Sequence, residues 1–233
     1  SFDIPPASGG ARLSFVIDDA GYDLDALRLY LAVPLPLAIA VLPQLEKSRE
    51  AAALVVSAGK ELMLHQPMQA ENEKLWPGPG AVEPGMTPEA IRTLVQANLE
   101  GLGIGVRGMN NHEGSLITAD ETLIGAVLDA ALDYGVFFMD SRTTAKSKVS
   151  QAAGERGMKV LTRDIFIDNV LDREAMLAQI YEGLALANKN GKAIMIGHVE
   201  KSAGILPALL TELAPALLDR DYELVCPSQL MRE

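Results

Sequence analysis

Apolar runs of strand length alternate with helix-periodic segments along the whole chain, and this alternation constrains the fold more than any other feature. The predicted strands are 12–18, 37–42, 61–65, 104–109, 136–140, 159–164, 193–198 and 222–226. Helices are predicted near 23–32, 45–58, 88–101, 120–134, 173–190 and 204–219. This order is typical of an α/β fold built from βα units, in which helices connect parallel strands.

The strands indicate one closed or nearly closed barrel. Several of them, such as 193–196, are continuous apolar runs, which are typical of parallel strands buried on both faces. Seven or eight βα units without a break in composition favour a single (β/α)7-8 barrel, with an open doubly wound sheet as the alternative. We assign residues 11–233 to this domain and residues 1–10 to a linker.

Composition excludes several classes of protein. Hydrophobic residues make up 48% of the 233 residues, which is enough for a sizeable core, and no apolar stretch approaches the roughly 18 residues of a membrane span. The net charge of -11 argues against nucleic acid as a partner. The only cysteine, Cys226, excludes an intramolecular disulfide and a cysteine-based zinc site.

All three histidines follow an apolar run that is predicted to be a strand. They are His65, His112 and His198, and the carboxylates of Asp18 and Asp19 end a fourth such run. The carboxyl ends of parallel strands meet at one face of a barrel, where active sites form. Imidazoles and carboxylates gathered there are typical of a metal-assisted hydrolase.

Each of these residues also has a structural interpretation. An aspartate after a strand often caps the next helix, but two adjacent carboxylates repel each other unless a cation or proton separates them. Asp18 as general base and Asp19 as metal ligand would resolve that conflict. His65 could be a core histidine, and His112 could belong to an Asx turn. As ligands, Asp19, His65 and His112 would leave a coordination position for water, as catalytic zinc requires.

His198 is expected to be a general acid, or otherwise to bind a neighbouring loop. Asp140 or Asp164 could orient His198 or Arg163 through a charge-assisted hydrogen bond, although Asp164 suits a structural ion pair. Trp76, in the aperiodic segment 66–87, could stack on a sugar or anchor the loop. The residues expected to bind substrate or support the site are Asn110, Asn111, Asp140, Arg142, Arg163, Asp164 and Trp76.

Several short motifs resemble those of a known family. The segment 16–21, Val-Ile-Asp-Asp-Ala-Gly, resembles the first motif of the polysaccharide deacetylase (NodB-like) carbohydrate esterases. Segments 59–65 and 196–198 resemble the second motif and the late motif with the catalytic histidine. Together with 64–68, Leu-His-Gln-Pro-Met, and 110–115, Asn-Asn-His-Glu-Gly-Ser, they resemble the divergent polysaccharide deacetylase branch from about residue 11 onward.

This resemblance implies a distorted (β/α) barrel, with zinc or another divalent metal as cofactor and a carbohydrate as substrate. It implies Asp18 as general base, Asp19 and His65 as metal ligands, and His198 as the acid that protonates the departing amine. The ordinary second motif has another histidine four residues after the first, where this chain has Gln69. His112 must replace that ligand if the metal site is retained.

The leading hypothesis is therefore a metal-dependent hydrolase that removes N-acetyl groups from a bacterial amino-sugar polysaccharide. A carbohydrate- or peptidoglycan-binding module on an inactive deacetylase scaffold is the alternative, motivated by Gln69. Hydrolysis of a phosphoester fits less well, because Arg142 and Arg163 are the only candidate phosphate ligands. The substrate class, and a start without an initiator Met or a signal-type segment, predict a periplasmic or cell-envelope protein.

Overall fold

The computed structural model describes residues 2–232, so Ser1 and Glu233, the outer ends of the expected linker and domain, lie outside the described residues. The elements are β1 Arg12–Ala20, α1 Leu24–Leu31, β2 Leu37–Val41, α2 Ser48–Ser57, β3 Glu61–Met68, α3 Pro88–Leu102, β4 Val106–Glu113, α4 Glu121–Tyr134, β5 Phe137–Asp140, α5 Val149–Glu155, β6 Val160–Thr162, β7 Ile165–Phe166, α6 Arg173–Asn190, β8 Lys192–His198, α7 Val199–Ser202, α8 Leu206–Leu218, β9 Glu223–Leu224 and α9 Pro227–Leu230.

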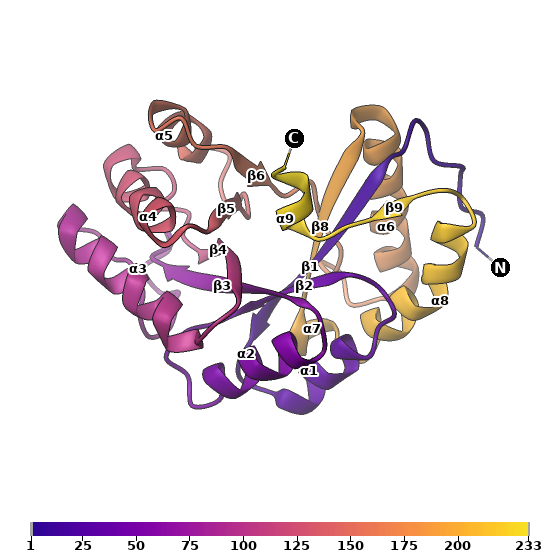
Figure 1. Ribbon diagram of the computed structural model, residues 1–233, viewed down its shortest axis with the longest axis horizontal. Helices are drawn as coiled ribbons and strands as arrows, with labels where there is room; N and C mark the ends of the chain where they lie inside the picture. Colours follow the sequence, from indigo (N-terminus) through magenta and orange to yellow (C-terminus); the bar gives the residue numbers. More distant parts are fainter. Residues whose placement is uncertain (1, 233) are drawn as a thin grey trace.

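The strands form one curled parallel sheet with the helices around its outside (Figure 1). The strand order is β6-β5-β4-β3-β2-β1-β8-β7, and β9 pairs with the start of β1. The chain crosses the gap between the two edges at residues 163 and 164. The backbone N–H of Arg163 donates to Asp140 on one side, and that of Asp164 donates to Ile194 on the other. The predicted single (β/α) barrel is thus confirmed, in a distorted form whose edges are joined by this short connection.

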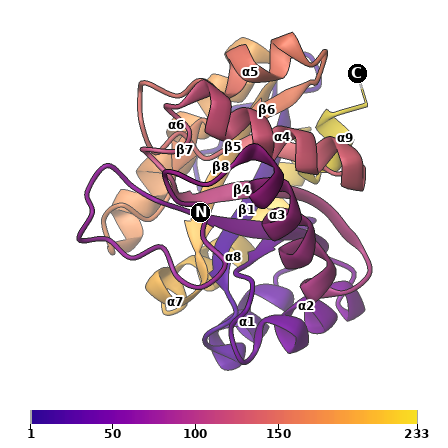
Figure 2. The same ribbon diagram turned by 90° about the vertical axis from the view of Figure 1, so that its left-hand side faces the viewer.

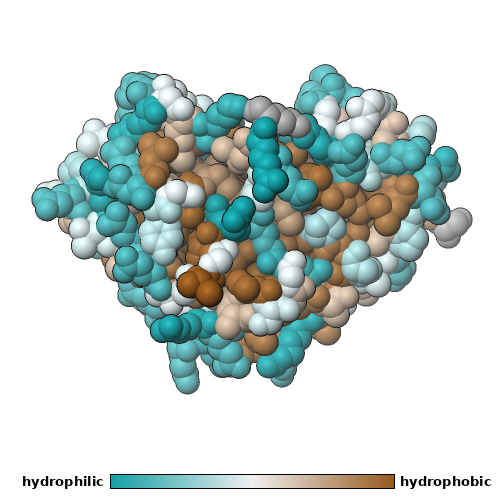
Figure 3. Space-filling model, in the orientation of Figure 1, coloured by the Kyte–Doolittle hydropathy of each residue, from teal (hydrophilic) through white to brown (hydrophobic). Residues whose placement is uncertain are grey.

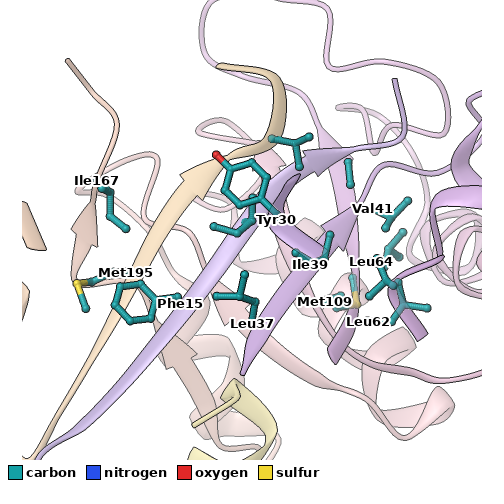
Figure 4. Close-up of a cluster of buried hydrophobic side chains, with 14 of the residues drawn as sticks. Phe15, Tyr30, Leu37, Ile39, Val41, Leu62, Leu64, Met109, Ile167 and Met195 are labelled. Carbon is teal, nitrogen blue, oxygen red and sulfur yellow. The ribbon is translucent and has the colours of Figure 1, made fainter. Parts of the chain in front are cut away.

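Alternation along the strands divides the apolar residues into two clusters. One lies between the sheet and the helices and includes Phe15, Ile39, Leu64 and Met195 (Figure 4). The other lies inside the barrel; it includes Val16, Met63, Met139 and Ile196, and Leu230 of α9 completes it. Because side chains alternate between the two faces of a strand, the odd or even position of a residue along its strand (its parity) decides which cluster it joins.

The interior cluster occupies the end of the barrel where the strands begin. The short helix α9 lies there, since Ser228 donates its backbone N–H and its hydroxyl to the Glu61 carboxylate at the start of β3. Figure 2, turned by 90°, shows α3 and α4 side by side on the outside of the sheet. The polar pocket of the barrel lies at the opposite end, where the strands finish.

Four of the described helices begin directly after a residue whose side chain caps them. Asp23, Thr87, Asp120 and Asp172 accept hydrogen bonds from backbone N–H groups of the first turn of α1, α3, α4 and α6. These side chains satisfy N–H groups that have no partner within the helix. The starts of α3 and α4 are thus fixed by their own local sequence.

Several boundaries differ from the prediction. Strand β3 continues to Met68 instead of ending at His65, and β4 runs from Val106 to Glu113, so it contains the polar residues expected beyond it. The strand predicted at 159–164 is interrupted, because β6 ends at Thr162 and the chain continues as β7 only at Ile165–Phe166, beyond the predicted end. The strand predicted at 222–226 retains only two residues of strand. The polarity of Asn110–Glu113 hid the end of β4, because these side chains point into a polar pocket.

The segment expected to be a linker has no regular secondary structure in residues 2–10, yet Ile4 is buried in the outer cluster. Its backbone is held by hydrogen bonds from Ala7 to Arg220 and from Ser8 to Asn188. None of the described helices is long and apolar enough to cross a membrane. Apolar residues gather towards the middle of the face seen in Figure 3, with mainly hydrophilic residues around its periphery.

Candidate metal centre and active site

Strand alternation brings polar side chains together above the interior cluster. Val16, Met63 and Ile196 point into the barrel, and Asp18 and His65 lie two residues further along β1 and β3. His198 likewise follows Ile196, and Asn110 and His112 share one face of β4. A pocket of about 240 Å³ opens at these strand ends, and Asp18, His65, His112 and His198 line it.

Asp19 reaches the same pocket although its parity is opposite to that of Asp18. The pairing of β1 with β2 is irregular between Ile17 and Ala20, and the backbone of Asp19 has a φ of 66°. A bulge of this kind turns a side chain to the other face of a strand. The left-handed backbone of Asp19 therefore lets two adjacent carboxylates serve one site.

Three potential ligand atoms form a nearly equilateral triangle. Asp19 Oδ1 lies 3.1 Å from His65 Nε2 and 3.0 Å from His112 Nδ1, and the two nitrogens are 3.0 Å apart. Ligands about 2.0–2.1 Å from a tetrahedral zinc ion lie about 3.3 Å from each other. The observed triangle is close to that spacing, so these three residues fit a divalent metal ion.

The electrostatics of the triangle also favour a cation. Asp19 Oδ1 is buried and makes no hydrogen bond of acceptable geometry within residues 2–232. Burial alone would raise the pKa of Asp19, but the imidazoles of His112 and His65 outweigh it and lower that pKa. Burial lowers the pKa of His65, but the charges of Asp18 and Asp19 and the contact with Asn110 raise it to about 9. Both shifts stabilise positive charge beside Asp19, which a metal ion would supply.

Asn110 fixes both Asp18 and His65. Its Nδ2 donates to Asp18 Oδ1 at 2.8 Å, and its Oδ1 lies 2.7 Å from His65 Nδ1. Since an amide oxygen can only accept, Nδ1 of His65 carries a proton and donates it. The Nε2 lone pair of neutral His65 then faces the triangle, as a metal-ligating histidine requires.

Asp18 is 1% exposed and is placed between His65 and His198. Burial raises its pKa, against the charges of His65 and His198 and the hydrogen bond from Asn110, which lower it. Asp18 Oδ2 lies 3.7 Å from His65 Nε2, too far for a hydrogen bond. This carboxylate oxygen is therefore available to accept a proton from a molecule in the pocket.

His198 is oriented by Asp168, which sequence reasoning did not select. Asp168 is fully buried; its Oδ1 lies 2.8 Å from His198 Nδ1, and its Oδ2 accepts the His198 backbone N–H at 2.7 Å. Burial lowers the pKa of His198, but Asp168 and the charge of Asp18 raise it overall. The signal was the apolar run 165–167, which ends at Asp168 in the way that the other strands end at their site residues.

The expectation that Asp140 or Asp164 orients His198 is wrong. The carboxylate of Asp140 accepts from the backbone of Arg142 and from the Ser147 hydroxyl. Asp164 accepts the backbone N–H of Ile194 at 2.8 Å. Neither carboxylate hydrogen bonds to the side chain of His198 or Arg163 within residues 2–232.

Two of the other predicted residues lie away from the pocket, and two support its wall. Trp76 is 75% exposed in the loop after β3 and does not line the pocket, and neither does Arg142. Arg163 donates to the carbonyl oxygens of Ser141 and Arg142 and stacks 3.8 Å over the ring of Phe166. Asn111 lines the pocket and hydrogen bonds within its wall.

Gln69 takes no part in the triangle. Its side-chain amide donates to the carbonyl oxygen of Ala70 at 3.1 Å, and its backbone pairs with Val82 of the loop. The third potential ligand atom belongs to His112, on the neighbouring strand β4.

Comparison with known proteins identifies the family. The sequence model of the family described as "divergent polysaccharide deacetylase" matches residues 15–231 of this chain. The chain belongs to the divergent polysaccharide deacetylase family. The uncharacterized protein YibQ of Escherichia coli (strain K12) is 30% identical over 223 residues, which are 95% of this chain and 68% of YibQ.

Solved structures share the fold of this family member. The uncharacterized protein ATU2773 from Agrobacterium tumefaciens C58 matches with a TM-score of 0.86 at 18% identity, covering 97% of this chain and 92% of that one. The chitin deacetylase from Colletotrichum lindemuthianum matches with a TM-score of 0.58 at 10% identity, covering 99% and 91%. These neighbours place the curled sheet among the deacetylase-type barrels.

Proposed function

We propose that this chain is a metal-dependent hydrolase that removes N-acetyl groups from an amino-sugar polysaccharide. The observation that carries the proposal is the triangle of Asp19, His65 and His112, with Asp18 and His198 in the same pocket. The family and the fold neighbours, among them the fungal chitin deacetylase, support the same class of substrate.

Asp19 Oδ1, His65 Nε2 and His112 Nδ1 would hold the cation, and two imidazoles with one carboxylate suit zinc. When bound, a divalent cation supplies Lewis acidity that polarises a carbonyl and acidifies water. Asp18 accepts a proton from the water while the oxygen of that water forms a bond to the acetyl carbon. The C–N bond then breaks, acetate leaves, and His198 Nε2 gives a proton to the amine nitrogen.

The surroundings of the two catalytic groups suit these roles. A buried carboxylate with a raised pKa is a stronger base than an exposed one, and Asp18 has that environment. Asp168 keeps a proton on His198 Nδ1 and raises the pKa of this imidazole, which favours the doubly protonated form that donates from Nε2.

The shape of the surface supports a chain-like substrate. A second depression of about 400 Å³ meets the pocket at Asp19 and His112, and Tyr22, Glu200 and Lys201 line it. Two depressions that share the candidate ligands give an elongated groove, so residues of a glycan can lie on both sides of the reacting acetyl group.

The test is metal content by elemental analysis, together with acetate release from N-acetylglucosamine oligomers. Asp19→Ala, His65→Ala and His112→Ala should each lose metal and activity together. Asp18→Asn and His198→Gln should keep the metal and lose turnover by about 10²–10⁴-fold. His198→Gln is the matched control, because it removes a pocket histidine outside the triangle. Full metal content in both Asp19→Ala and His65→Ala would contradict the ligand set.

The alternative is a glycan-binding module without catalysis, and it rests on the loss of the second-motif histidine at Gln69. It predicts a measurable dissociation constant for the same oligomers and no acetate release from the zinc-loaded protein. Acetate release that disappears in Asp18→Asn rejects it.

We also propose a periplasmic or cell-envelope location, because bacterial amino-sugar polysaccharides are found there. Fractionation of cells that produce the full-length protein tests this; recovery only with cytoplasmic markers would contradict it.

A further inference from the structure

One wall of the pocket is formed where β4 and β5 end, and Asn111 holds it together. Asn111 Oδ1 accepts the backbone N–H of Ser141 at 2.9 Å, and its Nδ2 donates to the Glu113 carbonyl oxygen at 2.8 Å. The Thr143 hydroxyl donates to the same carbonyl at 2.9 Å. These bonds fix Glu113 and Ser141 relative to each other, and also relative to His112, which directly precedes Glu113 in the chain.

The two fixed residues have polar groups that lack partners within residues 2–232. Ser141 is 2% exposed and lines the pocket, and its Oγ makes no hydrogen bond. The Glu113 carboxylate makes no ion pair or hydrogen bond to the described part of the chain, and Glu113 also lines the pocket. A buried hydroxyl without a partner is uncommon, and a ligand group that reaches this one from the pocket would supply the missing hydrogen bond.

Glu113 is held in an unfavourable backbone conformation. Its φ of 53° lies in the left-handed region, which costs energy for a residue with a side chain. Such conformations persist where the surrounding bonds enforce them, as the bonds from Asn111 and Thr143 do here.

The charge of the pocket indicates what this wall binds. Of the described residues that line it, Asp18, Asp19 and Glu113 have carboxylates, and none is a lysine or arginine. A bound divalent cation would offset Asp18 and Asp19, and the Asp168 carboxylate already offsets the positive charge of His198. The negative charge of Glu113 would therefore remain without compensation. A ligand group with positive charge and hydrogen-bond donors complements it.

We propose that Glu113 and Ser141 form a subsite for the sugar next to the one being deacetylated, and that this subsite prefers a glucosamine residue with a free ammonium group. The inference rests on the proposed function and specifies its substrate as a partly deacetylated glycan. Glu113 accepts hydrogen bonds from the ammonium group, and Ser141 Oγ bonds to a sugar hydroxyl. Fully acetylated and anionic glycans bind less tightly.

The test is calorimetric binding of two probes, glucosamine tetramer and N-acetylglucosamine tetramer, at about pH 6, where amines are protonated. Wild type should bind the glucosamine probe more tightly, in a salt-dependent manner. Glu113→Gln keeps a hydrogen-bonding side chain but removes the charge. It should lower the affinity for the glucosamine probe about tenfold and the affinity for the acetylated probe less than threefold. Glu50→Gln, on the exposed side of α2, is the matched control and should change neither.

Ser141→Ala provides a second variant, and it should weaken both probes to a similar extent because it removes a bond to a hydroxyl. Equal weakening of both probes in Glu113→Gln would overturn the preference for an ammonium group, and no change in either variant would overturn the subsite. Binding is read without turnover, so an inactive protein with the expected pattern would refute the proposed function but retain the subsite. An active protein without the pattern would refute only the subsite.

Discussion

Replacing Asp168 by Asn tests the arrangement around His198 more directly than any other single change. Asp168 is fully buried and makes two short bonds to His198, one to the ring Nδ1 and one from the backbone N–H. Asparagine can keep the backbone bond through its oxygen, but its amide NH₂ then faces Nδ1 and cannot accept a proton from it. The variant therefore loses the bond that holds the Nδ1 proton.

The expected size follows from that single bond. A hydrogen bond between charged groups contributes about 1.5–3 kcal/mol, and one pKa unit corresponds to about 1.4 kcal/mol. The pKa of His198, which Asp168 helps to raise above its ordinary value, should fall in Asp168→Asn, because the carboxylate that favours the charged imidazole is gone. Because a neutral imidazole is a much weaker acid than the doubly protonated form, turnover should fall by about 10²–10⁴-fold with metal content unchanged.

Stability should change over a defined pH window. Because the pKa of His198 is raised, this residue contributes stability at a pH below the ordinary histidine pKa. That stability is lost as the pH rises through the raised pKa. Because the pKa of Asp168 is lowered, this residue contributes stability at a pH above the ordinary aspartate pKa. That stability is lost as the pH falls through the lowered pKa. The pair contributes fully between about pH 4 and 6.5. The loss of unfolding free energy in Asp168→Asn should be largest there and smaller at alkaline pH.

Proton NMR titration is a suitable assay, because the chain has only three histidines and their ring signals can be assigned by substitution. Asp164→Asn is the matched control, since Asp164 also accepts a backbone N–H of β8 but does not contact an imidazole. A His198 pKa that is the same in Asp168→Asn as in wild type would refute the reasoning, and so would an equal fall in the control.

Three further changes have definite outcomes. Gly108→Ala places a Cβ 2.2 Å from the Phe137 ring, so denaturant unfolding should show a loss of about 1–3 kcal/mol; unchanged stability would contradict this contact. Asn110→Ala removes the bonds that orient a candidate ligand and should weaken zinc binding about 10–100-fold in a competition titration, which an unchanged affinity would contradict. Adding Gln69→His to His112→Ala should not restore zinc, because position 69 is bonded to its loop; full recovery would show that the loop can supply the ligand.

Much of the fold could be predicted because the apolar pattern alone determines it. The continuous run at 193–198 is strand β8, and the caps at Thr87 and Asp120 begin helices α3 and α4. Boundaries failed where polar residues lie inside a strand, as at the end of β4. The split of residues 159–164 could not be predicted, because it depends on the sheet curling until its two edges nearly meet.

Residue type and strand position were enough to select the members of the triangle and Asp18 and His198, which lie in one pocket. Asp168 was missed because the strand before it was predicted to end at residue 164, and its role depends on a contact between β8 and the segment after β7. The bulge at Asp19 could not be predicted either, because nothing in the sequence indicates that this non-glycine residue has a φ of 66°. Glu113 was passed over for a similar reason, because its importance follows from bonds to its backbone.

The register of β3 and β4 explains how His112 can take a position that the ordinary motif gives to the residue after β3. His65 pairs with Asn110, and Pro67 pairs with His112, so a residue on the inner face of β4 projects beside His65. Gln69 lies beyond the last residue of β3, where the chain has joined a long loop. A ligand on a strand is positioned by the hydrogen bonds of the sheet, whereas one on a loop depends on the order of that loop. With the third potential ligand on β4, the geometry of the candidate metal centre therefore does not depend on the side chain at position 69.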